Sequence, residues 1–297
     1  MRPLIVSLRP PEWVKNVLVF AGIVFSRRFD ESGAVADVLV TFVAFCAISS
    51  AGYLFNDLRD VEHDRRHPDK RRRPIASGAL SERAAGAAAL FLAFLAVVLP
   101  LIFVSPEVAA IVGIYAVATV LYSVVLKRLV IIDVMTISAL FILRVVAGAV
   151  AVGAGASEFL LVCTAMLALF LGFTKRRQEA ILEELPPAGA TPAEAALPAT
   201  RPVLEHYSLP FLDQMIAMVT ATALISYILY AVDSPFAGSK MLATAPSVLY
   251  GVFRYLYLIY DRNDTRSTAA IIAKDPGVIF AGATYVASAI VVLYVLD

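Results

Sequence analysis

The chain has 297 residues, of which 60% are hydrophobic and 16% are charged, and its formal net charge is +1. Soluble domains carry about 25% charged and 45–50% apolar residues, so this composition excludes an ordinary soluble domain. The mean hydropathy of +0.80 favours a membrane protein. We expect a lipid bilayer around the chain, and no nucleic-acid partner.

Apolar segments of about 18 residues recur along the whole chain, which is the length that a transmembrane helix needs. We therefore expect an all-α, polytopic protein that forms one integral-membrane domain over residues 1–297. The first span is the least regular, because it is short and contains Lys15 and Asn16. The nine predicted spans are residues 13–29, 35–55, 84–104, 107–126, 130–152, 157–174, 213–233, 241–258 and 277–296.

Lys and Arg are divided unequally between the two sets of loops. If the N-terminus is cytoplasmic, 21 of the 25 Lys and Arg residues lie in or beside the inward-facing loops. The positive-inside rule then predicts a multi-pass protein of the bacterial inner membrane whose polar site faces the cytoplasm. The polar cytoplasmic loops are expected at about residues 56–83, 126–130, 175–212 and 259–276.

An acidic run closes the second predicted span. Asp57, Asp60 and Asp64 stand at i, i+3 and i+7, which is one face of a helix, and Asn56 precedes Asp60 by one turn. Crowded carboxylates repel each other unless a cation joins them, and Mg2+ prefers carboxylate, water and phosphate oxygens. We predict a Mg2+ site of these four residues, with the three aspartates as catalytic residues.

A dense basic stretch follows the acidic run directly. Its fixed positive charge suits phosphate oxygens, and Arg65, Lys70 and Arg73 are the expected phosphate contacts. Acidic and basic residues side by side at a membrane surface predict a metal–pyrophosphate site. The alternative is a solvated loop whose charges pair locally.

Two charged residues belong to the fifth predicted span. Arg144 stands near its middle, where a charge costs roughly 2.5–3.5 kcal/mol. Asp133 shares its helix face but lies about 16 Å away along the axis, too far for a direct pair. We expect Arg144 either to point into a polar cavity or to bond helix carbonyls, and Asp133 to bind substrate or to orient Lys127.

The order of these features resembles the UbiA superfamily of intramembrane prenyltransferases. The matching features are Asn-Asp-x-x-Asp-x-x-x-Asp from Asn56, Tyr122-x-x-x-x-Lys127 after the fourth span, and the number of spans. The resemblance implies a nine-helix bundle with a cytoplasmic-facing central cavity. In that family a second acidic motif ends the sixth span, but here this position reads Lys175-Arg-Arg-Gln-Glu179.

This departure resembles one branch, the decaprenyl-phosphate phosphoribosyltransferases. The same branch is indicated by Arg9-Pro-Pro-Glu-Trp-Val-Lys-Asn16 and by Lys70-Arg-x-Arg-Pro-Ile-Ala-Ser-Gly78. It implies transfer of 5-phosphoribosyl from 5-phosphoribosyl diphosphate to a polyprenyl phosphate, with Mg2+ as cofactor and pyrophosphate as product. Beyond the acidic run and the basic stretch, the expected substrate-binding residues are Lys15, Asn16, Tyr122, Lys127, Asp133, Arg144, Lys175, Arg176 and Glu179.

Two other functions stay open. A prenyltransferase could act on an aromatic acceptor, although the basic sixth-span motif argues against it. A transporter of a phosphate-bearing solute could use Arg144 and the acidic run, but transporters usually contain paired repeats. Arg201, Glu205 and Tyr207 of the long loop are candidates for capping the site, and a homo-oligomer is possible.

Overall fold

The structure is a computed structural model that describes residues 2–26, 28–66, 70–184, 202–234, 237–262 and 268–295. Every regular element within these ranges is helical. The chain forms two compact units, which we call the first unit (residues 1–126 and 139–156) and the second unit (residues 127–138 and 157–297). The expected all-α fold is confirmed, and the prediction of a single domain stays a prediction.

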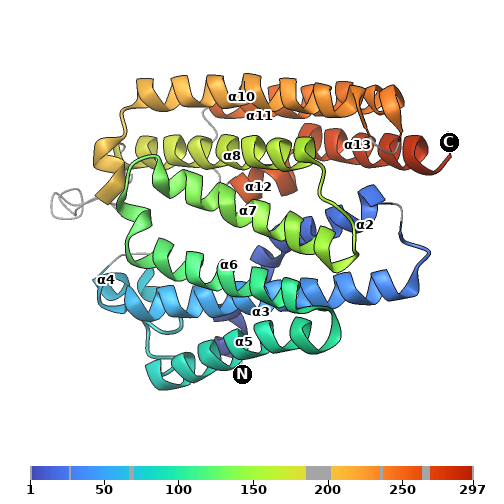
Figure 1. Cartoon of the computed structure of the whole chain (residues 1–297). Helices are drawn as coiled ribbons and strands as arrows, with labels where there is room; N and C mark the ends of the chain where they lie inside the picture. Colours follow the sequence, from blue (N-terminus) through green and yellow to red (C-terminus); the bar gives the residue numbers. More distant parts are fainter. Residues whose placement is uncertain are drawn as a thin grey trace. The chain divides into compact units, whose positions relative to one another are not determined.

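Eight of the described helices are long and apolar enough to cross a membrane. This confirms the polytopic membrane protein that hydropathy predicts. The eight are α3 (Ser32–Arg59), α5 (Glu82–Phe103), α6 (Pro106–Val124), α7 (Ile132–Ala151), α8 (Glu158–Glu184), α10 (Leu209–Val232), the pair η5 (Gly238–Thr244) with α11 (Ala245–Tyr260), and α13 (Pro276–Tyr294) (Figure 1).

The first predicted span, residues 13–29, is not a continuous α-helix. After α1 (Arg2–Leu8) the chain turns at Arg9 and forms the 3-10 helix η1 (Pro10–Phe20), then the short α2 (Ala21–Ser26). Arg9 has a φ of 54°, in the left-handed region, and the two prolines that follow have no backbone N–H to donate. The count of nine is therefore not confirmed, and the described parts of the chain contain eight candidate spans.

Within the first unit, α3 packs against both α5 and α6 (Figure 1). The helix η1 packs against the C-terminal half of α7 through a glycine. A Cβ on Gly148 would lie 1.8 Å from the backbone oxygen of Val19, so only glycine permits this approach. Val19 and Ile23 are fully buried there, which fixes the segment that follows Arg9 against the body of the unit.

Within the second unit, α8 packs against α10, and α11 packs against α13. Phe170, Phe173, Tyr255 and Ile259 form part of its apolar core. Short helices make the polar connections of the two units. They are α4 (Val61–Arg66), η2 (Lys70–Arg72), η3 (Leu126–Arg128), η4 (Pro202–His206) and α12 (Thr268–Lys274).

Candidate active site

The acidic run of the first unit folds as the end of α3 and the start of α4. The N–H of Asp60, the last residue before α4, donates to the carbonyl of Asn56 at 3.0 Å, and the N–H of Asp64 donates to the carbonyl of Asp60 at 2.8 Å. The near-helical path therefore continues through the junction. Asp57 and Asp64 both end in the interior, with side chains that are 3% exposed.

Two arginines pair with these buried carboxylates. Arg73 Nη1 lies 2.7 Å from Asp64 Oδ2 and 3.1 Å from Asp57 Oδ1, so that it bridges the two aspartates. Arg9 Nη2 lies 2.7 Å from the same oxygen of Asp57. A buried carboxylate is costly unless it is paired and hydrogen-bonded, so the arginines make this acidic pair tolerable inside the unit.

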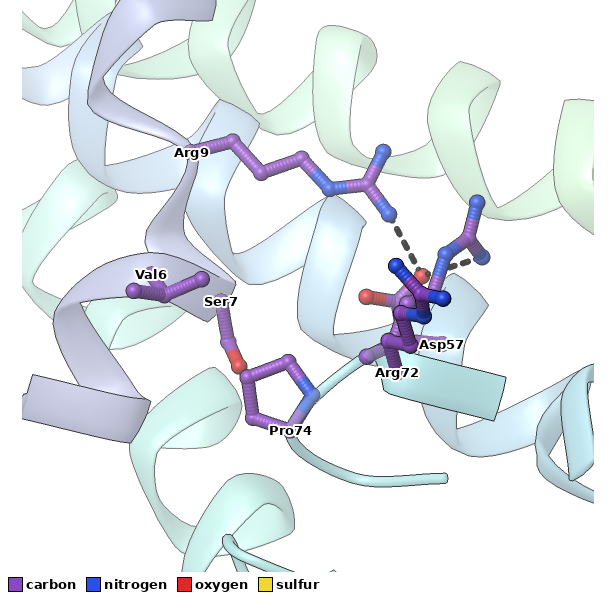
Figure 2. A pocket seen from close by; sticks show the side chains of 7 residues that line it. Val6, Ser7, Arg9, Asp57, Arg72 and Pro74 are labelled. Atoms are coloured by element: carbon purple, nitrogen blue, oxygen red, sulfur yellow. Dashed lines mark hydrogen bonds and ion pairs between the residues drawn. The ribbon is translucent and has the colours of Figure 1, made fainter. Parts of the chain in front are cut away.

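The arginines and Asp57 line an open pocket of about 310 Å³. Figure 2 shows the Arg9 guanidinium extending to Asp57, with Val6, Ser7 and Pro74 below Arg9 in this view. The complete lining is Val6, Ser7, Arg9, Asp57, Arg72, Arg73 and Pro74. The pocket thus combines one carboxylate with three guanidinium groups, which is a suitable environment for a phosphate ester that carries a cation.

The aspartate pair fits one divalent cation. No group of three or more His, Cys, Asp or Glu side chains within the described residues is arranged to hold a metal. However, Mg2+ usually takes only one or two protein carboxylates and completes its shell with waters and substrate phosphates. The arginines use Asp57 Oδ1 and Asp64 Oδ2, and within the described residues the second oxygen of each carboxylate remains as a ligand. The other predicted ligands, Asn56 and Asp60, are half-buried.

Two of the predicted phosphate contacts are engaged in local ion pairs. Lys15 pairs with Glu12 on η1. Arg65 lies 2.5 Å from Glu62 and 3.0 Å from Glu82, and its side chain is exposed. These contacts are of the local kind that the charge-balanced alternative predicts. A substrate role for either residue stays a prediction.

Arg144 is buried and hydrogen-bonded inside the first unit. Its Nη1 donates to the carbonyl of Leu140 at 2.8 Å, its Nε to Asn16 Oδ1 at 2.8 Å, and its Nη2 to the hydroxyl of Tyr115 at 2.6 Å. The bond to a helix carbonyl is one of the two expected arrangements. The side chain thus joins η1, α6 and α7, and substrate binding by Arg144 or Asn16 stays a prediction.

The second unit contains a buried polar cluster at the start of α7. Arg176 Nε lies 2.6 Å from Asp133 Oδ2, and the hydroxyl of Tyr207 donates to Asp133 Oδ1 at 2.7 Å. The N–H of Ile131 in turn donates to the Tyr207 hydroxyl at 2.6 Å. Burial, then the bond to Asp133, raises the pKa of Tyr207, so this hydroxyl remains a neutral donor.

The basic motif of α8 has one side chain inside the protein and one at the surface. Arg176 also pairs with Glu179, at 2.5 Å, and its side chain is 1% exposed. Lys175 lies 4.0 Å from the other oxygen of Glu179 and is 49% exposed. Arg177 pairs with Asp213 at 2.7 Å. Lys175 is therefore the member of the motif that a solvent-borne or lipid-borne anion can reach.

The remaining predicted residues lie at the ends of spans. Tyr122 near the end of α6, Lys127 in η3 and Lys70 in η2 are all half-buried. Arg201 lies outside the described residues. Asp133 contacts Arg176 and Tyr207, and its expected role in orienting Lys127 stays a prediction.

Sequence reasoning missed Arg9 as a site residue. The residue begins the N-terminal motif that carried the resemblance, but it is separated from Asp57 by 48 positions. No spacing rule connects two residues so far apart on different helices. The signal was present only as the unusual Arg-Pro-Pro sequence, which predicts a turn and not the direction of the side chain.

The fold and the site together define a class of protein. It is an all-helical, multi-pass membrane protein with a buried, arginine-bridged aspartate pair beside a pocket. The chain belongs to the UbiA prenyltransferase family, whose family model matches residues 17–280. A solved UbiA homolog from Archaeoglobus fulgidus, bound to GPP and Mg2+, has the same fold. Its TM-score is 0.74 at 17% identity, over 99% of this chain and all of that one.

Two relatives with assigned names are more similar in sequence. The chain is 36% identical to the decaprenyl-phosphate phosphoribosyltransferase of Corynebacterium glutamicum over 240 residues, which cover 77% of this chain and 67% of that protein. It is 33% identical to the protein of the same name from Mycolicibacterium smegmatis over 242 residues, 80% of this chain and 73% of that one. The branch that the motifs indicate is therefore confirmed.

Proposed function

We propose that the protein transfers a 5-phosphoribosyl group from 5-phosphoribosyl diphosphate to a polyprenyl phosphate and releases pyrophosphate. The names of the relatives at 33% and 36% identity support this substrate pair. The observation that carries the chemistry is the buried pair of Asp57 and Asp64, bridged by Arg73 at the edge of a pocket. The pair offers ligands for a cation, and the surrounding guanidinium groups offer contacts for phosphate oxygens.

The reaction breaks the bond between ribose C1 and the diphosphate oxygen, and forms a bond from C1 to an oxygen of the acceptor phosphate. Negative charge develops on the departing pyrophosphate. A divalent cation held by Asp57 and Asp64 would neutralise part of this charge. The guanidinium groups of Arg72 and Arg73 line the same pocket and donate hydrogen bonds to the phosphate oxygens, which orients the leaving group.

The acceptor needs cations more than it needs a base. A phosphate monoester is already an anion near neutral pH, so its oxygen attacks C1 without deprotonation by the protein. Lys175 is the most exposed cation of the α8 motif, and we assign it to the acceptor phosphate. Arg176 is held between Asp133 and Glu179, and we assign it to positioning this end of α8.

The reaction is proposed for the cytoplasmic face of the bacterial inner membrane. The excess of Lys and Arg in the inward-facing loops supports this orientation. The polar phosphoribosyl donor would then enter from the cytoplasm, and the lipid acceptor from the bilayer.

The test is pyrophosphate release by the purified protein in detergent with Mg2+. Release is expected from 5-phosphoribosyl diphosphate only when a polyprenyl phosphate is also present. Release from a prenyl diphosphate with an aromatic acceptor, and none from the phosphoribosyl donor, would contradict the proposal and identify a prenyltransferase instead.

A further inference from the structure

We propose that Arg9 binds the diphosphate group of the phosphoribosyl donor, as a site residue supplied by the segment before the first apolar span. The inference rests on the proposed function, because it names a residue of the same pocket. It depends on three features of the first unit, namely the backbone at Arg9, the bonds that fix this backbone, and the position of the guanidinium group.

The backbone at Arg9 is in an unfavourable conformation. Its φ of 54° and ψ of 58° lie in the left-handed region, where a residue with a Cβ is strained. Glycine adopts this conformation without that cost, yet the position carries a long cationic side chain. Strain of this kind persists only where the surroundings impose it, and it is typical of functional sites.

A single serine fixes the chain on both sides of Arg9. The hydroxyl of Ser50 on α3 donates to the carbonyl of Leu8 at 3.0 Å, and it accepts a hydrogen bond from Trp13 Nε1 at 3.0 Å. Leu8 precedes Arg9 directly, and Trp13 follows it by about one turn of η1. The turn at Arg9 is thus fastened to the helix that carries Asp57.

A second anchor lies further along η1. Asn16 is fully buried and accepts the hydrogen bond from Arg144 Nε, and Val19 packs against Gly148 without space for a Cβ. The residues of the N-terminal motif therefore have different roles. Trp13 and Asn16 dock the segment, while Arg9 is the member that reaches the pocket.

The guanidinium group of Arg9 has donors left for a ligand. Within the described residues only Nη2 makes a hydrogen bond, to Asp57 Oδ1, and the guanidinium carbon lies 4.8 Å from the ring centre of Tyr53. The side chain is 30% exposed and lines the pocket (Figure 2). An arginine fork with free N–H groups matches the paired oxygens of a phosphate.

The position of Arg9 selects the diphosphate and not the 5-phosphate of the donor. Asp57 is a proposed ligand of the divalent cation, and Mg2+ in such sites is shared between protein carboxylates and substrate phosphates. The diphosphate must therefore lie next to Asp57, within reach of the Arg9 guanidinium group that bonds Asp57. With a cation on the second oxygen of Asp57, Arg9 would keep its bond to Asp57 Oδ1 and would donate its remaining N–H groups to a diphosphate oxygen.

The experiment measures ligand binding through the thermal unfolding midpoint of the full chain in detergent. Wild type and Arg9→Gln are titrated with pyrophosphate at fixed Mg2+, and separately with ribose 5-phosphate. Wild type is also titrated with 5-phosphoribosyl diphosphate and Mg2+. Arg9→Gln is expected to raise the half-saturating pyrophosphate concentration by about tenfold or more, because a hydrogen bond to a charged group is lost. Its response to ribose 5-phosphate should equal that of wild type.

Arg28→Gln is the matched control. Arg28 is also in the first unit, is 37% exposed, and pairs with Glu31 and with the carbonyl of Val152. Its loss should leave the pyrophosphate response unchanged. If Arg9→Gln responds to pyrophosphate as wild type does, Arg9 is only a counter-charge for Asp57 and the inference is wrong, although the proposed function stands. No response of wild type to 5-phosphoribosyl diphosphate with Mg2+ would contradict the proposed function itself.

A measurement on the wild-type protein covers the case in which Arg9→Gln does not fold. Arginine side chains are modified with phenylglyoxal, and the modified peptides are counted by mass spectrometry. Pyrophosphate with Mg2+ should protect Arg9, whereas ribose 5-phosphate with Mg2+ should not. Equal modification of Arg9 with and without pyrophosphate would overturn the inference.

Discussion

Arg176 and Asp133 form a buried ion pair in the second unit, with 2.6 Å between Arg176 Nε and Asp133 Oδ2 and with both side chains no more than 1% exposed. The pair gives a physical meaning to the basic motif of α8. The motif is not a row of solvated cations, because its middle arginine is held by Asp133 and by Glu179.

Replacing Arg176 by alanine should destabilise the protein strongly. Removing one partner of a buried pair leaves the other charge uncompensated, which costs about 3–5 kcal/mol. Thermal unfolding in detergent should show a large drop in the midpoint. Lys175→Ala is the control, because surface substitutions usually change stability by no more than about 0.5 kcal/mol. Equal midpoints for the two variants would contradict the structural role of Arg176.

Lys175→Ala should affect the acceptor and not the fold. Losing a charge-assisted hydrogen bond to the acceptor phosphate is expected to raise the KM for polyprenyl phosphate by about tenfold. The KM for 5-phosphoribosyl diphosphate should stay close to the wild-type value. Steady-state kinetics with each substrate varied in turn separates the two effects, and an unchanged KM for the lipid would remove Lys175 from the site.

Tyr207→Phe should remove two hydrogen bonds at once, from the hydroxyl to Asp133 and from Ile131 N–H to the hydroxyl. The cost is about 1–3 kcal/mol, since buried partners are left unsatisfied. The pKa of Tyr207 is raised in the folded state. The difference in unfolding free energy between wild type and Tyr207→Phe should therefore be constant below about pH 10, the ordinary pKa of tyrosine. It should decline above that pH.

Unfolding free energies of wild type and Tyr207→Phe, measured from neutral to alkaline pH, test this directly. A difference that instead grows with rising pH below the ordinary tyrosine pKa would mean that the folded state holds the tyrosinate. That result would reverse the direction of the hydrogen bond assigned here.

Gly148→Ala should prevent η1 from docking on α7. The new Cβ would lie 1.8 Å from the backbone oxygen of Val19, and backbone atoms cannot move aside cheaply. We expect a loss of folded protein in detergent, seen as an early unfolding midpoint. Gly113→Ala on α6 is the control, because a Cβ there meets nothing within 4 Å and alanine favours a helix by up to about 1 kcal/mol. A normal midpoint for Gly148→Ala would contradict the packing.

Much of the fold follows from the sequence because long apolar runs have few alternatives in a membrane. The shared helix face of Asp57 and Asp64 also follows from local information, since their spacing is i and i+7, whereas the burial of both side chains does not. The prediction of a continuous first span was wrong because hydropathy does not reveal the turn at Arg9 or the 3-10 helix that follows it. Hydropathy reports where a segment is apolar and not how its backbone is bonded.

Contacts between residues far apart along the chain could not be predicted from the sequence. Arg9 meets Asp57 across 48 positions, and Arg176 meets Asp133 across 43. A run of Lys and Arg at the end of a span is expected at the surface, and only the folded chain shows that Arg176 turns inward. Asp133 stabilises Arg176, but the sequence around Asp133 has no pattern that identifies Arg176 as its partner.

The most direct test of the central claim follows two labels in one reaction. Donor labelled separately in the ribose and in the diphosphate is incubated with polyprenyl phosphate, Mg2+ and the purified protein, and the lipid phase is extracted. The account predicts that the ribose label enters the lipid phase and the diphosphate label stays in water. Transfer should stop in Asp57→Asn and after removal of Mg2+ by EDTA. Full transfer by Asp57→Asn, or no ribose label in the lipid of the wild-type reaction, would contradict it.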